Sequence, residues 1–217
     1  MSRIPRGLLV VLDVDSTLIG EEVVDLLADA AGAGEEVAAI TAAAMRGELD
    51  FAASLTRRVG LLAGLPESVL ATVRGRISVT RGVPELVAAV HAAGGMVGAV
   101  SGGFEQVLTP LAEELGLDRW RANRLEVAAG RLTGRIHGAV VDADAKRAAL
   151  LEWAAEAGAD RARTVAIGDG ANDLRMLEAA GLGIAFDAKE AVRRRADVVL
   201  PGRDLGPVIG LLGLASD

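Results

Sequence analysis

A chain of 217 residues with an apolar fraction of 51% is long enough to bury a core and to hold one domain with a sizeable insertion. Its net charge of -7 argues against nonspecific binding to nucleic acid or an anionic membrane, and its lack of cysteine excludes disulfides, thiol catalysis and thiolate metal sites. No apolar run approaches the roughly 20 residues of a membrane span, and the run at 8–12 is too short for a signal peptide, so we expect a cytoplasmic protein.

The first predicted strand is the aliphatic run 8–12, which leads directly into Asp13-Val14-Asp15. An unbroken apolar run indicates a strand buried on both faces, as in a parallel sheet. A charged residue at the end of such a strand is costly unless it faces a polar site, and in open α/β sheets that site lies beyond the carboxyl ends of the strands. We therefore expect both acids at the mouth of an active site. The short motif alone fits a strand that ends in a turn, with Asp at a helix N-cap, equally well.

A helical segment is predicted after this motif. Glu21, Glu22 and Asp25 fall in the first turns of its first helix, where the helix dipole favours acidic side chains. The helical pattern continues over residues 35–76, interrupted only by glycine- and proline-containing breaks. No strand-like run occurs there, so we expect a small all-helical insertion.

An α/β pattern then returns for the rest of the chain. The predicted helices are residues 84–93, 104–115, 143–157 and 174–180. The predicted strands are residues 96–100, 164–167, 183–186 and 198–200, with a hairpin over 125–134. This alternation predicts an α/β fold, a Rossmann-like parallel sheet with helices on both faces. We expect a core of residues 1–18 and 79–217, with a helical cap of residues 19–78 inserted after the first strand.

Polar signatures follow three of the buried strands: Asp13-x-Asp15, Ser101-Gly102 and Gly168-Asp169-x-x-Asn172-Asp173. The ends of parallel strands lie along one edge of the sheet, and Lys146 begins a helix that can reach the same edge. Several carboxylates without a basic partner fit a hard divalent cation. Serine, lysine and loop amides suit the oxygens of a phosphate. Together these groups predict phosphoryl transfer.

These signatures have a familiar order and spacing. They are Asp13-Val14-Asp15-Ser16-Thr17, Ser101-Gly102-Gly103-Phe104, Lys146 and Gly168-Asp169-Gly170-Ala171-Asn172-Asp173. In this order they resemble the four motifs of the haloacid dehalogenase superfamily, and within it the chain is similar to the phosphoserine phosphatases over almost its whole length. Val14 stands where relatives commonly carry Phe or Met, which is a difference in packing.

The resemblance implies a Mg2+-dependent hydrolysis of O-phospho-L-serine to L-serine and phosphate, the last step of serine biosynthesis. Asp13 would be the nucleophile that forms an aspartyl-phosphate. Asp15 would protonate the leaving group and later activate water as a base. Lys146, Ser101 and the backbone at Gly102 would bind the oxygens of the phosphoryl group.

The resemblance also implies a metal site and an amino-acid site. Mg2+ would be held by Asp13, the backbone carbonyl of Asp15 and Asp169, with Asp173 as a ligand or just outside the coordination shell. The remaining expected contacts are Glu22 to the substrate ammonium, Arg58 to its carboxylate, apolar walls from Met45 and Phe51, and Asn172 orienting Lys146 or the metal ligands.

Each of these residues, taken singly, also has an ordinary structural explanation. Glu22 fits a helix N-terminus, Met45 and Phe51 fit a hydrophobic core, and Arg58 and Lys146 fit a solvated surface. Ser101 fits a turn. Only the four signatures together favour catalysis over these explanations.

Several functions share these motifs. The leading one is phosphoserine hydrolysis, with a small phosphorylated amino acid as the partner, no nucleic acid or membrane, and a monomer or homodimer. A phosphotransferase to an acceptor such as homoserine would use the same aspartyl-phosphate, and a phosphatase for another small ester is a third possibility. A non-catalytic binding protein would usually lack the nucleophile or a metal-binding acid, and neither is missing here.

Overall fold

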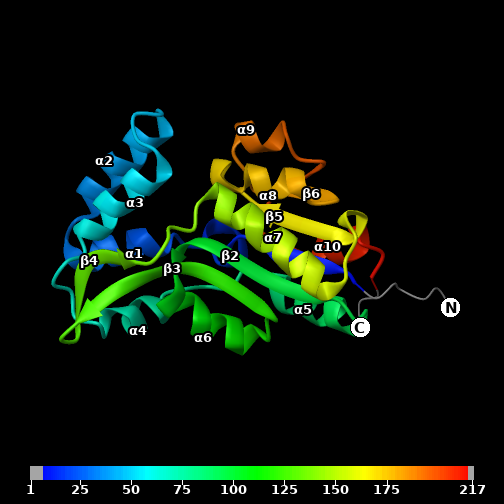
Figure 1. The fold of residues 1–217 in the computed structure, drawn as a ribbon, viewed down its shortest axis with the longest axis horizontal. Coiled ribbons are helices and arrows are strands. Elements are labelled where there is room, and N and C mark those ends of the chain that lie inside the picture. Colours follow the sequence, from blue (N-terminus) through cyan, green and yellow to red (C-terminus); the bar gives the residue numbers. More distant parts are fainter. Residues whose placement is uncertain (1–6, 215–217) are drawn as a thin grey trace.

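A seven-stranded sheet forms the centre of the computed structural model, which describes residues 7–214 (Figure 1). The strands are β1 (Leu9–Leu12), β2 (Met96–Phe104), β3 (Arg119–Ala128), β4 (Arg131–His137), β5 (Thr164–Gly168), β6 (Leu182–Phe186) and β7 (Val198–Leu200). Their order is β4-β3-β2-β1-β5-β6-β7. All neighbours are parallel except β3 and β4, which form an antiparallel pair. The predicted parallel α/β sheet and its hairpin are therefore confirmed.

The central strand β1 explains why its sequence shows no alternation of apolar and polar residues. Leu9 and Val11 belong to the hydrophobic core on one face of the sheet, whereas Val10 and Leu12 belong to the core on the other. All four side chains are fully buried. Since β1 lies between β2 and β5, the residues that follow these three strands meet at one edge.

Helices cover both faces of the sheet, as predicted. The helices α7 (Ala143–Ala157) and α8 (Leu174–Ala179) pack on the face of Leu9 and Val11. The other face is covered by α5 (Val83–Ala92), α6 (Glu105–Leu115) and α10 (Gly206–Leu211). A short helix, α9 (Glu190–Arg193), follows β6. No helix within residues 7–214 is long and apolar enough to cross a membrane.

Four further helices lie in the chain between β1 and β2. They are α1 (Val23–Ala31), α2 (Gly34–Met45), α3 (Phe51–Gly60) and α4 (Val69–Arg74). In Figure 1, α2 and α3 stand beyond the sheet near β4. Backbone hydrogen bonds join the α3–α4 loop to β4: Gly64 N donates to Leu132 O at 2.8 Å, and Leu132 N donates to Leu65 O at 2.9 Å.

These helices fall within the segment 19–78 that the sequence predicts as a cap. The division into this cap and a core of residues 1–18 and 79–217 stays a prediction. Residues 1–6 and 215–217 of that core lie outside the described residues.

Several predicted boundaries are wrong; the hairpin, for example, is longer than the predicted 125–134, because β3 begins at Arg119 and β4 ends at His137. The first helix begins at Val23, so Glu21 and Glu22 precede it instead of lying in its first turns. The reason is that the Asp15 side chain accepts a hydrogen bond from the Val23 backbone N–H at 3.1 Å, at the start of the helix. Strand β2 extends to Phe104 because its pairing with β3 resumes there after a shift in register, beyond the strand 96–100 that was predicted.

Candidate active site

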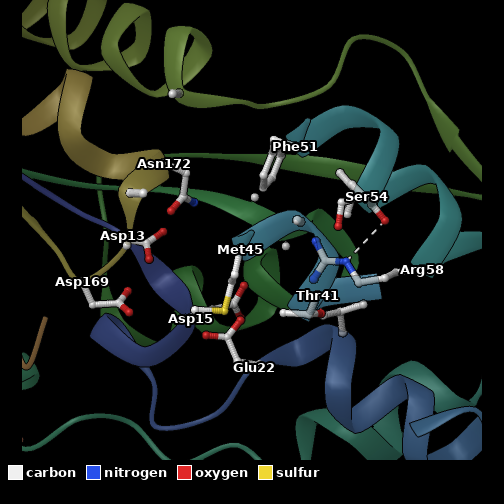
Figure 2. A pocket seen from close by; sticks show the side chains of 18 of the residues that line it. Asp13, Asp15, Glu22, Thr41, Met45, Phe51, Ser54, Arg58, Asp169 and Asn172 are labelled. Atoms are coloured by element: carbon white, nitrogen blue, oxygen red, sulfur yellow. Dashed lines mark hydrogen bonds between the residues drawn. The ribbon is translucent and has the colours of Figure 1, made fainter. Parts of the chain in front are cut away.

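A cavity of about 420 Å³ lies where the polar signatures meet helices α2 and α3 (Figure 2). The predicted site residues that line it are Asp13, Asp15, Glu22, Met45, Phe51, Arg58, Gly102, Asp169 and Asn172. Three other predicted residues, Ser101, Lys146 and Asp173, are buried and do not line the cavity. The fold thus brings the predicted set together, in one layer facing the cavity and one layer behind it.

Lys146 occupies the centre of the buried layer. Its ammonium donates to Asp13 Oδ1 at 2.5 Å and to Asp173 Oδ1 at 2.6 Å, and its side chain is fully inaccessible to solvent. The ordinary explanation of Lys146 as a surface residue is therefore wrong. Among the described residues, its hydrogen bonds do not include Asn172, for which the prediction is that it orients either Lys146 or the metal ligands.

Asp13, Asp169 and Asp173 form a cluster in which one carboxylate oxygen from each residue lies within 4.8 Å of the other two. Burial and the neighbouring Asp173 carboxylate raise the pKa of Asp13 well above its usual range. Burial, followed by Asp173 and Glu22, raises the pKa of Asp169 to about 6. When all three acids are ionised, one ammonium against three carboxylates leaves two negative charges, so the donor set fits a divalent cation with oxygen ligands. A metal at this cluster is consistent with both its charge and its chemistry.

Asp15 has a different environment from Asp13, although only one residue separates them. Its Oδ1 accepts from the Val23 backbone N–H, and its Oδ2 accepts from Ser101 Oγ at 3.4 Å. Burial and the nearby charge of Glu22 raise the pKa of Asp15 to about 7. A carboxyl group with such a pKa holds a proton in a large share of molecules near neutral pH, which suits a general acid.

The glycine-rich signatures bring backbone amides and side chains close to one another. Ser101 Oγ accepts from Gly103 N at 2.7 Å, and Asp173 Oδ2 accepts from Gly170 N at 2.9 Å. A Cβ atom at Gly103 would lie 2.7 Å from the Asp15 carboxylate, which only glycine avoids. The glycines therefore allow the carboxylates to approach the backbone closely.

The opposite end of the cavity is formed by helices α2 and α3. Figure 2 shows Asp13 and Asp169 on one side and Arg58 on the other, with Met45 and Phe51 between them. The half-buried Arg58 donates to the backbone oxygen of Ser54 at 3.4 Å and has no carboxylate within 4 Å among the described residues. Burial lowers the pKa of Arg58. A desolvated guanidinium without an ion-pair partner is suited to an anionic group of a ligand.

Glu22 and the apolar side chains complete this end. Glu22 Oε1 accepts a hydrogen bond from Ser16 Oγ at 2.8 Å. The Phe51 ring packs directly on the backbone of Gly102, where an added Cβ would lie 2.7 Å from the ring. Met45 is 65% exposed and overhangs the cavity in Figure 2. The interpretation of Met45 as a core residue is wrong, because core side chains are almost fully buried.

Sequence reasoning missed several residues that the fold brings to the site. Thr41, Ser54 and Lys189 line the cavity. Asn123 lies behind it, donates to Gly102 O at 2.8 Å and accepts from Val141 N at 2.7 Å, so it joins the end of β2 to the segment before α7. The one usable signal was for Lys189, because the chain contains only two lysines.

The comparison with known families agrees with this geometry. Residues 10–178 match the model of the haloacid dehalogenase-like hydrolases, which covers the Asp-x-Asp motif, Lys146 and the acidic cluster. The chain belongs to this family. This haloacid dehalogenase-like hydrolase is 52% identical to a phosphoserine phosphatase of Streptococcus thermophilus, over 95% of its own length and 96% of the relative.

Some longer relatives are similar to this hydrolase over only part of their length. A phosphoserine phosphatase of Streptomyces coelicolor is 53% identical over 96% of the chain, which spans only 51% of that relative. Among solved structures, a phospho-aspartyl intermediate analogue of phosphoserine phosphatase is similar with a TM-score of 0.90 and 41% identity. This similarity covers 95% of the chain and 99% of the solved one.

Proposed function

We propose that this hydrolase is a Mg2+-dependent phosphatase that converts O-phospho-L-serine to L-serine and phosphate. The observation that carries the proposal is the division of one cavity into two ends. The Asp13–Lys146 pair, with a cation bound at the acidic cluster, suits a phosphoryl group, while the guanidinium of Arg58 and the carboxylate of Glu22 suit an amino acid. Relatives of this length are named phosphoserine phosphatases, which supports the same assignment.

Asp13 is the proposed nucleophile. Lys146 engages Oδ1, which leaves Oδ2 to attack phosphorus as the bond to the serine oxygen breaks. Two unit charges 4 Å apart repel by about 4 kcal/mol at an effective dielectric constant near 20, so attack by one anion on another needs positive charge nearby. A Mg2+ ion held by Asp13, Asp169, Asp173 and the Asp15 carbonyl would supply that charge.

Asp15 is the proposed acid and base. Its carboxyl proton passes to the serine oxygen as that group leaves, which gives L-serine and a carboxylate. The same carboxylate then takes a proton from the water that attacks the aspartyl-phosphate, so phosphate and the original Asp13 are regenerated. The hydrogen bonds from Val23 N and Ser101 Oγ hold Asp15 in place during both steps.

The cap helices provide the proposed amino-acid site. Arg58 would bind the substrate carboxylate, Glu22 the ammonium, and Met45 and Phe51 the carbon chain between them. Since the cavity is lined by residues from both 19–78 and the predicted core, the cap would shield the reacting atoms from water.

The experiment that tests the proposal is phosphate release from O-phospho-L-serine, with Mg2+ and with EDTA, beside a panel of other phosphate esters. We expect fast release only with Mg2+ and selectivity for phosphoserine. Release from other esters, with phosphoserine left intact, would overturn the amino-acid assignment. Adding homoserine and measuring homoserine phosphate would distinguish a phosphotransferase from a phosphatase.

Removal of the Arg58 guanidinium is expected to damage phosphoserine use selectively. In Arg58→Ala we expect kcat/KM for O-phospho-L-serine to fall about 10- to 100-fold, because a charge-assisted contact with the carboxylate is lost. An aryl phosphate has no such carboxylate, so its kcat/KM changes by no more than about twofold.

The matched control is Arg57→Ala, which removes the same charge from the exposed position next to Arg58 and outside the cavity. This variant should hydrolyse both esters as the unmodified enzyme does. If Arg58→Ala loses activity equally on both esters, Arg58 does not bind the substrate carboxylate.

A further inference from the structure

Lysine is rare in this chain, and both lysines lie at the cavity. The sequence contains 21 arginines and only two lysines, Lys146 and Lys189. Lys146 lies directly behind the cavity, and Lys189 lines it. Among the basic side chains that the structure describes, all the others except that of Arg58 lie outside the lining of this cavity. Both lysines of the chain therefore lie at the same site.

Lys189 belongs to a segment that no active-site motif covers. It follows β6 and immediately precedes α9, and its backbone N–H donates to Asp169 O at 3.4 Å. The charges of Lys146 and Lys189 both oppose the rise in the pKa of Asp169, which puts the Lys189 ammonium within electrostatic range of the acidic cluster. Its side chain is exposed and forms no ion pair within 4 Å with any described residue.

The acidic side chains that line the cavity repel the negatively charged phosphate of the substrate. Four carboxylic acids line the cavity: Asp13, Asp15, Glu22 and Asp169. Lys146 is fully buried and already donates to two carboxylates, so it offers little positive charge at the entrance. Arg58 lies at the opposite end, as Figure 2 shows. Of the described lining residues, Lys189 is the one exposed cation at the phosphoryl end.

The choice of lysine has a physical reason. An arginine beside Asp169 could form a bidentate pair with that carboxylate and compete with a metal for its oxygens. An ammonium on a flexible chain acts as a point charge and can move from solvent to a phosphate oxygen without locking the carboxylate.

We propose that Lys189 recognises the phosphate of the incoming substrate and draws it into the acidic end of the cavity. This inference rests on the proposed phosphatase function and adds a residue that binds phosphate from the solvent side. Lys146 and Lys189 then have different roles. The buried Lys146 aligns Asp13, and the exposed Lys189 compensates the negative charge that repels the substrate.

The test is Lys189→Gln, assayed at saturating Mg2+ with O-phospho-L-serine and with an aryl phosphate. We expect KM to rise about three- to tenfold for both esters while kcat stays within about twofold, because the lost contact is to the group that the esters share. Competitive inhibition by inorganic phosphate should weaken by a similar factor. In the unmodified enzyme kcat/KM should fall with added salt more steeply than in the variant, because salt screens exposed charges.

Arg193→Gln is the matched control, since it removes one positive charge from the exposed face of α9 outside the cavity. Its kinetics should equal those of the unmodified enzyme, whereas Lys189→Arg should restore part of the lost affinity. If Lys189→Gln has the KM and salt dependence of Arg193→Gln, or loses only kcat, the proposal is wrong. The aryl phosphate allows this test even if phosphoserine is not the substrate, so the two proposals can fail separately.

Discussion

Asp13→Asn is expected to abolish turnover, with a loss in kcat of about 10^4-fold or more. An amide cannot attack phosphorus as a carboxylate does, so no aspartyl-phosphate forms. The substitution keeps the volume of the side chain and removes a carboxyl group whose burial raises its pKa, so we expect the protein to stay folded. The measurement is phosphate release from O-phospho-L-serine, with circular dichroism to verify the fold.

Asp160→Asn provides the control for Asp13→Asn. Asp160 is exposed and precedes β5 at the far end of that strand from the cavity. Its replacement should leave the rate unchanged. A trapping experiment with labelled phosphoserine should detect a phosphorylated carboxylate in the unmodified enzyme and none in Asp13→Asn. Substantial turnover by Asp13→Asn would remove this residue as the nucleophile.

Lys146→Met is expected to damage both stability and catalysis. The ammonium is the shared partner of two buried carboxylates, Asp13 and Asp173, and its loss leaves them uncompensated. Breaking a buried ion pair in this way costs about 3–5 kcal/mol, which we expect as a loss in the free energy of unfolding in the presence of EDTA. We also expect kcat to fall about 10^2- to 10^3-fold, because positive charge near the phosphoryl group is lost.

Urea unfolding with and without Mg2+ separates these two effects. A divalent cation that binds the folded state should restore part of the stability of Lys146→Met by mass action, but not its rate. The neighbouring Arg147→Met, at an exposed position, should change the free energy of unfolding by no more than about 0.5 kcal/mol. Unchanged unfolding of Lys146→Met in EDTA would show that the two carboxylates do not depend on its charge.

Local patterns in the sequence were sufficient for the architecture. The aliphatic run of β1 and the run before Gly168 indicated strands buried on both faces, and the structure confirms them. The order of parallel strands then implied that Asp13, Ser101 and Asp169 would lie near one another. Such predictions succeed because a strand that is buried on both faces needs an apolar residue at every position.

The positions of individual side chains could not be predicted from local sequence patterns. No local pattern shows that Lys146 is buried between Asp13 and Asp173, which are 133 and 27 residues away from it in the chain. The start of the first helix at Val23 depends on a hydrogen bond to Asp15 instead of on helix propensity.

The sequence by itself determined the α/β class, the helical segment after the first strand and the set of residues available for phosphoryl chemistry. Only the tertiary structure decided which of these face the cavity and which lie behind it, and it alone brought Thr41, Ser54 and Lys189 to the lining. The physical reason is that periodicity reports whether a residue is buried, whereas its neighbours across the cavity are set by packing between distant segments.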